Sequence, residues 1–347
     1  SYNVAVGSNA GRAVTTGVEN VLVGGLAGDA LTNSDRNVAV GHAALTTNTL
    51  GQYNTAIGYF ALGTANHTTA TDAYNTAVGY TAGGAITTGV NNTLIGAAAG
   101  DALTTGTRNV SVGYNNLSTD TKGQNTTAIG YQALANQNFT TATDSNNTAV
   151  GYNAGVSVTT GIQNTLIGGL AGDALTDADN NVSIGFGSLS TDTLGSTSTA
   201  IGNFTLNAQN FTTATSAYNV AVGYNSGASV TTGTTNTLIG ALAGDAITDA
   251  DHNVAIGWSA LTADTLGSGS TAIGRAALFS QNFTTATNAY NTAVGFNAGV
   301  AVTTGVANTL IGGLTGDAIQ AGNQNTFIGY NLATSGVNVE NQIAIGV

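Results

Sequence analysis

The chain has 347 residues, of which only 6% are charged, 49 are glycine and none is proline, cysteine or methionine. A globular domain carries about 25% charged residues, so this composition argues against an ordinary soluble enzyme domain. The 42% hydrophobic content argues equally against disorder. The net charge of −12 would repel phosphates, so we expect no nucleic-acid partner.

The sequence also lacks several features that would indicate where the protein is located. Without cysteine there are no disulfides and no thiolate metal sites, which suits an extracellular protein. No apolar run approaches the ~18 residues of a membrane span, so we expect no membrane insertion of this segment. No charged-then-apolar signal segment opens the chain and no initiator methionine is present, which predicts a processed product or an excerpt.

A short pattern that ends in Ile or Val and then glycine recurs along the whole chain. It closes at twenty glycines: Gly7, Gly24, Gly41, Gly58, Gly79, Gly96, Gly113, Gly130, Gly151, Gly168, Gly185, Gly202, Gly223, Gly240, Gly257, Gly274, Gly295, Gly312, Gly329 and Gly346. Their spacings run 17, 17, 17 and 21 residues and then repeat, giving a second period of 72 residues with four rung types. No linker interrupts the pattern, so we predict one continuous repeat domain over residues 1–347.

Each repeat unit predicts short strands. In Thr76-Ala77-Val78-Gly79-Tyr80, alternate residues share one face, and this period of two with β-branched residues is typical of a strand. Asn stands four residues before the glycine in sixteen units, and Thr stands eight residues after it in thirteen. Each unit therefore has room for two short strands and two turns. A helix is excluded, because the units are rich in Gly, Thr, Asn and Val.

Units this short cannot bury an apolar face alone, so they must stack into an all-β parallel β-solenoid of twenty rungs. Copies of one residue then lie about 4.8 Å apart along the stack, giving a length of roughly 95 Å. A repeated charge would repel its own copies, whereas a repeated Asn amide can bond the copies above and below. The low charge and the lack of proline thus follow from stacking.

The four rung types differ in how they fill the core. After the strand, the first two types read Ala-Gly and place an apolar residue later, as at Val158 and Leu175. The last two types place Leu early, as at Leu117, and turn polar later, at Asp120 and Gln137. We interpret the difference as two alternating ways of packing one edge of the core.

The second rung type carries Gly-Asp-Ala in all five copies, and an acidic turn follows in two of them. The candidate Ca²⁺ ligands are Asp173, Asp177, Asp179, Asp245, Asp249 and Asp251. Ca²⁺ takes six to eight oxygen ligands, which clustered carboxylates supply. The favoured alternative is no cofactor, because Asp at a turn bonds its own backbone and no bidentate Glu lies nearby.

The fourth rung type carries four extra residues, which should bulge outward. Each insert holds one aromatic or imidazole ring beside Thr and Asn, and the candidate receptor contacts are Phe139, Phe211, Phe283 and His67. A ring with polar neighbours suits sugar recognition. Packing of the same rings over the rung edge, or against a neighbouring chain, is the favoured interpretation.

Aromatic residues directly after the strand glycine form columns along the stack. Gly or Ala interrupts these columns in each rung of the second type, and such banding indicates shape matching between packed surfaces. Three histidines, His42, His67 and His252, stand in different rung contexts without a paired acid or nucleophile. No catalytic triad, zinc site or phosphate loop can be assembled from these residues. We therefore predict no enzyme activity.

Units such as Asn75-Thr76-Ala77-Val78-Gly79-Tyr80 and Asn253-Val254-Ala255-Ile256-Gly257 resemble the head repeat of YadA-like trimeric autotransporter adhesins and the related repeats of phage tail fibres. The resemblance covers essentially the whole chain, although the adhesin repeat is shorter than 17 residues. It implies a left-handed parallel β-roll, a homotrimer, and a role in projecting and binding at a cell or virion surface.

On this basis we expect an extracellular fibre or adhesin shaft, as a virion tail fibre or on a bacterial surface, whose receptor is a glycan. A self-assembling extracellular filament is the alternative, because an open solenoid end exposes unpaired strand groups. Ice binding through the Thr columns is a remote alternative, because Asn66 and its copies interrupt one such column at every fourth rung.

Overall fold

The computed structural model describes residues 2–332 and 336–346, and over these residues it is an all-β parallel β-solenoid, which confirms the predicted fold class. The chain divides into two compact units, Ser1–Asp177 and Ala178–Val347, built from the same kind of rung. Within the described residues there is no helix long and apolar enough to cross a membrane.

Each rung contributes one strand of the main sheet, which runs through the predicted Ile/Val–Gly pattern. In the first unit the strands are β1 (Val4–Val6), β2 (Val21–Val23), β3 (Val38–Val40), β5 (Thr55–Ile57), β7 (Thr76–Val78), β8 (Thr93–Ile95), β9 (Val110–Val112), β11 (Thr127–Ile129), β13 (Thr148–Val150) and β14 (Thr165–Ile167). In the second unit they are β15 (Val182–Ile184), β17 (Thr199–Ile201), β19 (Val220–Val222), β20 (Thr237–Ile239), β21 (Val254–Ile256), β23 (Thr271–Ile273), β25 (Thr292–Val294), β26 (Thr309–Ile311), β27 (Thr326–Gly329) and β28 (Ile343–Gly346).

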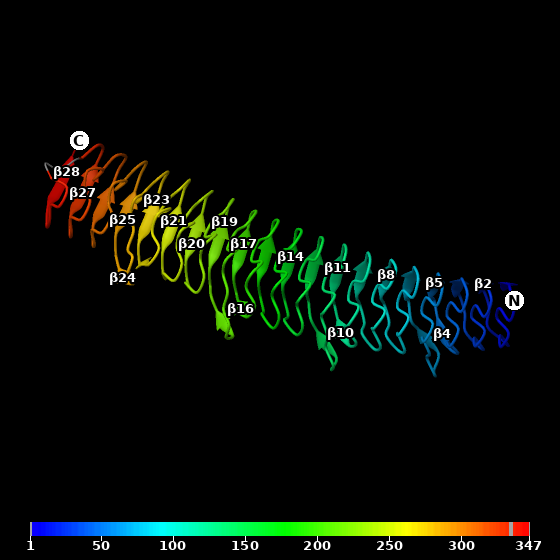
Figure 1. Ribbon diagram of the computed structural model, residues 1–347. Coiled ribbons are helices and arrows are strands. Elements are labelled where there is room, and N and C mark those ends of the chain that lie inside the picture. The colour runs from blue at the N-terminus through cyan, green and yellow to red at the C-terminus, as the bar shows by residue number, and fades with distance from the viewer. Residues whose placement is uncertain (1, 333–335, 347) are drawn as a thin grey trace. The chain divides into compact units, whose positions relative to one another are not determined.

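Neighbouring strands of each unit pair in parallel, one rung apart (Figure 1). Val4 lies opposite Val21 across a 17-residue rung, and Thr55 lies opposite Thr76 across a 21-residue rung. The register of the main sheet is therefore the same through both rung lengths, because the four extra residues lie outside the strand.

Among residues 2–332 and 336–346 a second strand forms only between the third and fourth rung types, so the room predicted for two strands in each unit is used by only some of the rungs. These two-residue strands are β4 (Gly51–Gln52) with β6 (Thr71–Asp72), β10 (Gly123–Gln124) with β12 (Thr143–Asp144), β16 (Gly195–Ser196) with β18 (Thr215–Ser216), and β22 (Gly267–Ser268) with β24 (Thr287–Asn288). Elsewhere a bend replaces the strand, and isolated bonds such as Gly17 N–H to Thr32 O (3.3 Å) link the rungs.

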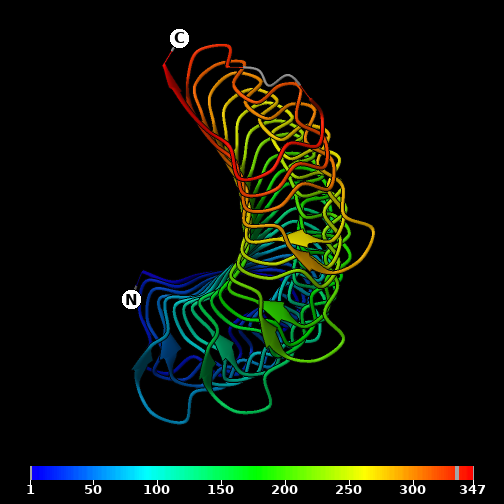
Figure 2. The same ribbon diagram turned by 90° about the vertical axis from the view of Figure 1, so that its left-hand side faces the viewer.

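The inserts bulge outward, as predicted. Residues 140–142 after Phe139 are exposed, and the equivalent loops project beyond the adjacent rungs of their own unit (Figure 2). The loop returns through the short strand β12, which pairs with β10. The extra residues therefore extend the rung sideways without disturbing the main sheet.

The middle residue of each three-residue strand from β2 to β26 is buried in the core, as Ala77 and Leu94 are. The two predicted ways of filling the core are confirmed. A Cβ on Gly83 would lie 2.7 Å from Leu94 Cδ1 and 3.0 Å from Leu62 Cδ2. The glycine of a first-type rung thus leaves room for leucine side chains from the rungs before and after it. The last two rung types have a leucine of their own at the position of this glycine.

The Asn column bonds along the stack, as predicted. Asn92 donates its backbone N–H to Asn75 Oδ1 (3.0 Å), and Asn75 Nδ2 donates to the backbone oxygen of Gly89 (2.8 Å). These amides are buried, and each satisfies backbone groups of the next rung. Asn therefore recurs because its side chain replaces a backbone partner where the chain turns into the strand.

Candidate functional site

The four side chains predicted to contact a receptor are buried in this chain. Phe139 is 5% exposed, Phe211 and Phe283 are 6% exposed, and His67 is 4% exposed. The rings fold back over the rung edge, and the exposed part of each insert is its run of Thr and Ala. The rings therefore pack within the insert of the single chain, which agrees with the favoured interpretation, and their contact with a receptor stays a prediction.

A buried polar network holds the second insert in place. Asp120 Oδ1 accepts the backbone N–H groups of Gly123 (3.0 Å) and Phe139 (3.1 Å). Gln137 Nε2 donates to Asp120 Oδ2 (2.7 Å), and Asn147 Nδ2 donates to Gln137 Oε1 (2.9 Å). The third and fourth inserts repeat the network through Asp192 with Gln209 and Asp264 with Gln281. The polar positions noted in the last two rung types thus anchor the insert loops.

Burial raises the pKa of several carboxyl groups, with Asp120 in the insert network and Asp101, Asp173 and Asp245 in the second rung type. A raised pKa means that the folded chain binds protons more tightly than the unfolded chain does. These carboxyl groups therefore contribute most to the free energy of unfolding below their pKa in the unfolded chain, which is about 4. Their contribution falls as the pH rises through their pKa values in the folded chain.

We expect these four carboxyl groups to outweigh His67, whose pKa burial lowers and whose contribution has the opposite sign, so that the melting temperature is higher at pH 4 than at pH 7. Thermal unfolding followed by circular dichroism across this range measures the effect. The double variant Asp120→Asn with Gln137→Ala, which copies Asn48 and Ala65 of the first insert, should flatten part of the slope. A melting temperature that rises steadily from pH 4 to pH 7 would contradict the expectation.

The candidate calcium ligands mostly bond along the stack. Asp177 accepts from Thr160 Oγ1 (2.6 Å) in the first unit. In the second unit Asp249 accepts from Thr232 Oγ1 (2.5 Å), Asp251 accepts from Thr234 Oγ1 (2.9 Å) and Asp245 accepts from Thr262 Oγ1. The backbone N–H of Asp179 donates to Ser196 Oγ (2.9 Å).

Asp173 differs from these, because its Oδ1 is buried without a hydrogen-bond partner among the described residues. Within that part of the chain, no three acidic or histidine side chains gather into a group that could hold a metal ion. Calcium binding stays a prediction.

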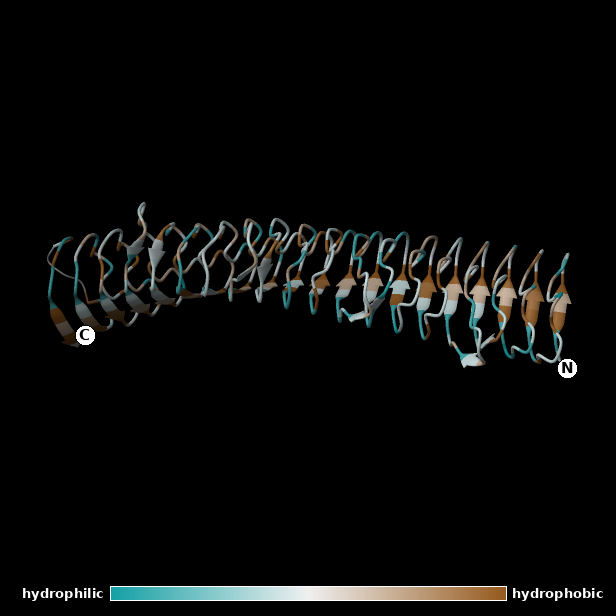
Figure 3. Cartoon of the chain, turned by 90° about the horizontal axis from the view of Figure 1, so that it is seen from below, coloured by the Kyte–Doolittle hydropathy of each residue, from teal (hydrophilic) through white to brown (hydrophobic). Residues whose placement is uncertain are grey.

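The main sheet has an exposed apolar side, which we call the outer face. It carries the first and third residue of each strand and the residue after the strand glycine. Its exposed large apolar residues are Val4, Val6, Val21, Ile57, Tyr59, Tyr80, Ile95, Tyr114, Ile129, Tyr131, Tyr152 and Ile167 in the first unit, and Phe186, Val220, Tyr224, Ile239, Trp258, Phe296, Ile311, Ile328, Tyr330, Ile343 and Ile345 in the second. Apolar colouring recurs on the strand arrows in Figure 3.

Aromatic rings on the outer face stack on one another between notches. Tyr131 stacks on Tyr114 and on Tyr152, with ring centroids 5.5 Å apart in both pairs. In the second unit the guanidinium of Arg275 lies 4.8 Å from the Trp258 ring and 5.2 Å from the Phe296 ring. Gly or Ala follows the glycine in each second-type rung, so the outer face alternates ridges of three rungs with notches of one.

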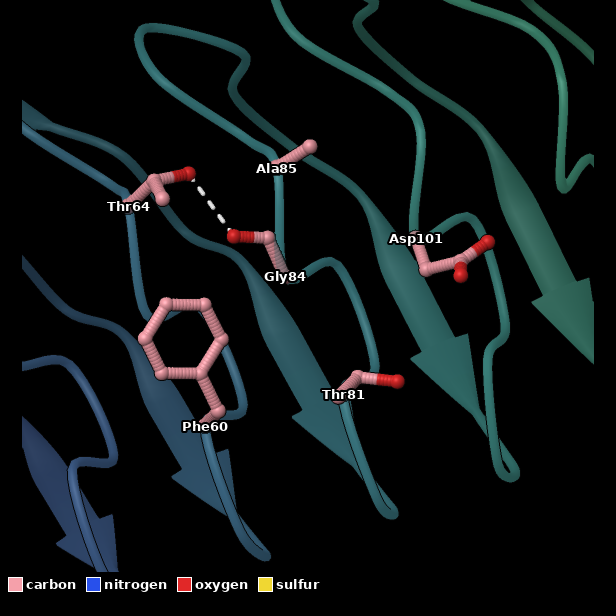
Figure 4. Close-up of a pocket in the computed structure, with 6 residues that line it drawn as sticks. All are labelled: Phe60, Thr64, Thr81, Gly84, Ala85 and Asp101. Atoms are coloured by element: carbon pink, nitrogen blue, oxygen red, sulfur yellow. Dashed lines mark hydrogen bonds between the residues drawn. The ribbon is translucent and has the colours of Figure 1, made fainter.

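A hollow of about 320 Å³ opens elsewhere in the first unit, and we call it the Gly84 hollow (Figure 4). Its lining consists of Phe60, Thr64, Thr81, Gly84, Ala85 and Asp101. These residues come from three consecutive rungs, those of β5, β7 and β8. Sequence reasoning missed the hollow. The available signal is Gly84 itself, which stands where the other first-type rungs have Arg12, Val156, Ala228 and Val300.

Comparison with protein-family models, with curated proteins and with solved structures finds no match for this chain. The outer face, the hollow and the resemblance of the repeat are the features of the chain that bear on its function.

Proposed function

We propose that the chain is the shaft of a non-enzymatic extracellular fibre or adhesin, in which three copies associate through their outer faces. The observation that carries the proposal is the exposure of this face: Tyr80 is 61% and Ile95 is 39% exposed in the single chain. Contiguous apolar patches of this extent are rare on soluble monomers and mark interaction surfaces.

The exposed area is sufficient for a stable interface. A fully buried aromatic side chain removes about 150–250 Å² from water, so five half-exposed tyrosines of the first unit offer about 500 Å². The exposed isoleucines on the same face bring the total close to the ~800 Å² per partner of a standard interface. The second unit adds a comparable set of residues.

A second copy of this chain is the partner that the outer face fits. The ridges and notches repeat every 72 residues, so a second copy is the partner whose surface has the same period. Few charges lie on the outer face, so two copies do not repel across it despite the net charge of −12. A trimer is the assembly that the resemblance to adhesin heads and tail fibres implies.

The placement at a virion or bacterial surface, and a glycan as receptor, rest on the same resemblance. The exposed Thr residues of the inserts, which recur once in each 72-residue period, suit repeated weak contacts with a polar receptor.

Sedimentation equilibrium combined with negative-stain imaging tests this function. We expect a discrete trimer whose mass does not change over a wide range of protein concentration. A monomer would overturn the shaft proposal. Fibres that lengthen with concentration would instead support the self-assembling filament.

A further inference from the structure

We propose that the Gly84 hollow binds one neutral saccharide residue, with its apolar side against Phe60 and its hydroxyls toward Asp101 and Thr81. The choice of ligand class rests on the surface role proposed above, while the site itself rests on side chains of the first unit. The volume of about 320 Å³ lies at the lower end of the ~300–1,000 Å³ that small-molecule sites occupy.

The hollow exists because two departures from the repeat coincide. Gly84 removes the side chain that Val156 and Val300 place at the equivalent position. Phe60, on the preceding rung, supplies an aromatic wall where Gln132 and Ala276 stand in the second and fourth periods. Phe204 stands there in the third period, but beside Ala228 and not beside a glycine. A Cβ at position 84 would lie 3.6 Å from Phe60 Cδ1, so the missing side chain is what leaves the wall open.

Asp101 offers a carboxylate whose hydrogen-bonding capacity is not fully used. Its Oδ1 is buried and has no hydrogen-bond partner among the described residues. At the equivalent Asp29, the same oxygen accepts from Thr46 Oγ1 (2.6 Å). In the second period Ser118 replaces that threonine, and its hydroxyl donates to the Ala135 carbonyl (3.3 Å) instead.

An unpaired buried carboxylate oxygen is costly, and burial raises the pKa of Asp101. A sugar hydroxyl then supplies the donor that Thr46 supplies at Asp29 and Thr262 supplies at Asp245. Asp173 lacks this donor too, but there Val156 fills the place of the hollow.

The remaining lining completes a site for a neutral polyol. Thr64 Oγ1 donates to the backbone oxygens of Gly84 (2.7 Å) and Ile86 (2.9 Å), which fixes the wall and leaves its own oxygen free to accept (Figure 4). The Phe60 ring provides the apolar surface on which the C–H face of a pyranose packs. The carboxylate and the net charge of −12 disfavour an anionic sugar.

The test uses the full chain and saturation-transfer NMR with glucose, galactose, mannose and N-acetylglucosamine. Gly84→Val fills the hollow with a residue that the same rung position already accepts at Val156 and Val300. Ala228→Val is the matched control, since it makes the equivalent change in the second unit. We expect wild type and Ala228→Val to bind at least one of these sugars, and Gly84→Val to bind at least tenfold more weakly.

Asp101→Ala is the second variant, which keeps the test decisive if Gly84→Val fails to fold, and it should weaken binding to a similar extent. Absence of binding by all four sugars, or unchanged binding by Gly84→Val or a folded Asp101→Ala, would overturn the saccharide site. The oligomeric state is measured on the same samples. A trimer that binds no sugar rejects only the hollow, whereas a monomer rejects the shaft.

Discussion

Replacing Gly96 by Ala is expected to destabilise the first unit by about 4 kcal/mol or more, which is exceptional for adding one methyl group. Gly96 closes β8 with φ +131°, a conformation that L residues rarely adopt. A Cβ at this position would overlap the backbone carbonyl of Gly113 on the next rung. The backbone cannot move aside cheaply, because the hydrogen bonds of the main sheet hold both rungs.

Those bonds run directly through the glycine column. The N–H of Gly96 donates to Val78 O (2.8 Å), and the N–H of Gly113 donates to Ile95 O (2.7 Å). To admit the methyl group, two rungs must separate, which breaks sheet bonds and opens the core beneath them. The positive φ alone costs about 1–3 kcal/mol, and the lost bonds and packing add to it.

Chemical denaturation of the variant and of wild type measures the change. Gly25→Ala is the matched control: position 25 has no such φ, its nearest atom to a new Cβ is His42 Cδ2 at 3.4 Å, and Ala97 occupies the equivalent place. The control should change stability by less than about 1 kcal/mol. Equal denaturation midpoints for the two variants would show that the glycine column is not required for stacking.

The repeated positions of this fold were readable from the sequence because stacking imposes one environment on every copy. The invariant Ile/Val–Gly pair predicted the strand, and the Asn column predicted the bonds between rungs. Both inferences needed only the periodicity and the reach of one side chain. The same reasoning did not show which rungs form the second strand, since backbone pairing in a bend depends on local dihedral angles that composition does not fix.

The candidate site was harder to predict, because its features are departures from the repeat. For Phe139 the sequence left packing and receptor contact as alternatives, and the structure buries the ring while Asp120 accepts its backbone N–H group. The Gly84 hollow depends on residues from three rungs, and the glycine at position 84 forms it only together with Phe60 and Asp101 of the neighbouring rungs. The sequence shows which positions depart from the repeat, but only the stacked structure shows which of these positions lie next to one another.

The double variant Tyr131→Asn with Tyr152→Ser is expected to dissociate the proposed trimer while leaving each chain folded. Both replacements occur in the chain at equivalent positions, as Asn203 and Ser8, so the rungs accept them. In the single chain the two rings stack on each other and are about half exposed. Their loss should therefore cost the fold little and the interface much.

Tyrosines buried at interface centres typically contribute about 2 kcal/mol each, so the pair should raise the dissociation constant at least about 100-fold. Sedimentation equilibrium measures this shift, with far-UV circular dichroism as the check on folding. Tyr74→Asn is the control: Tyr74 is exposed beside Tyr53, away from the outer face, and Asn146 stands at the equivalent position. A double variant that remains as tightly trimeric as Tyr74→Asn would show that the copies meet through another surface, because the outer face would then be dispensable.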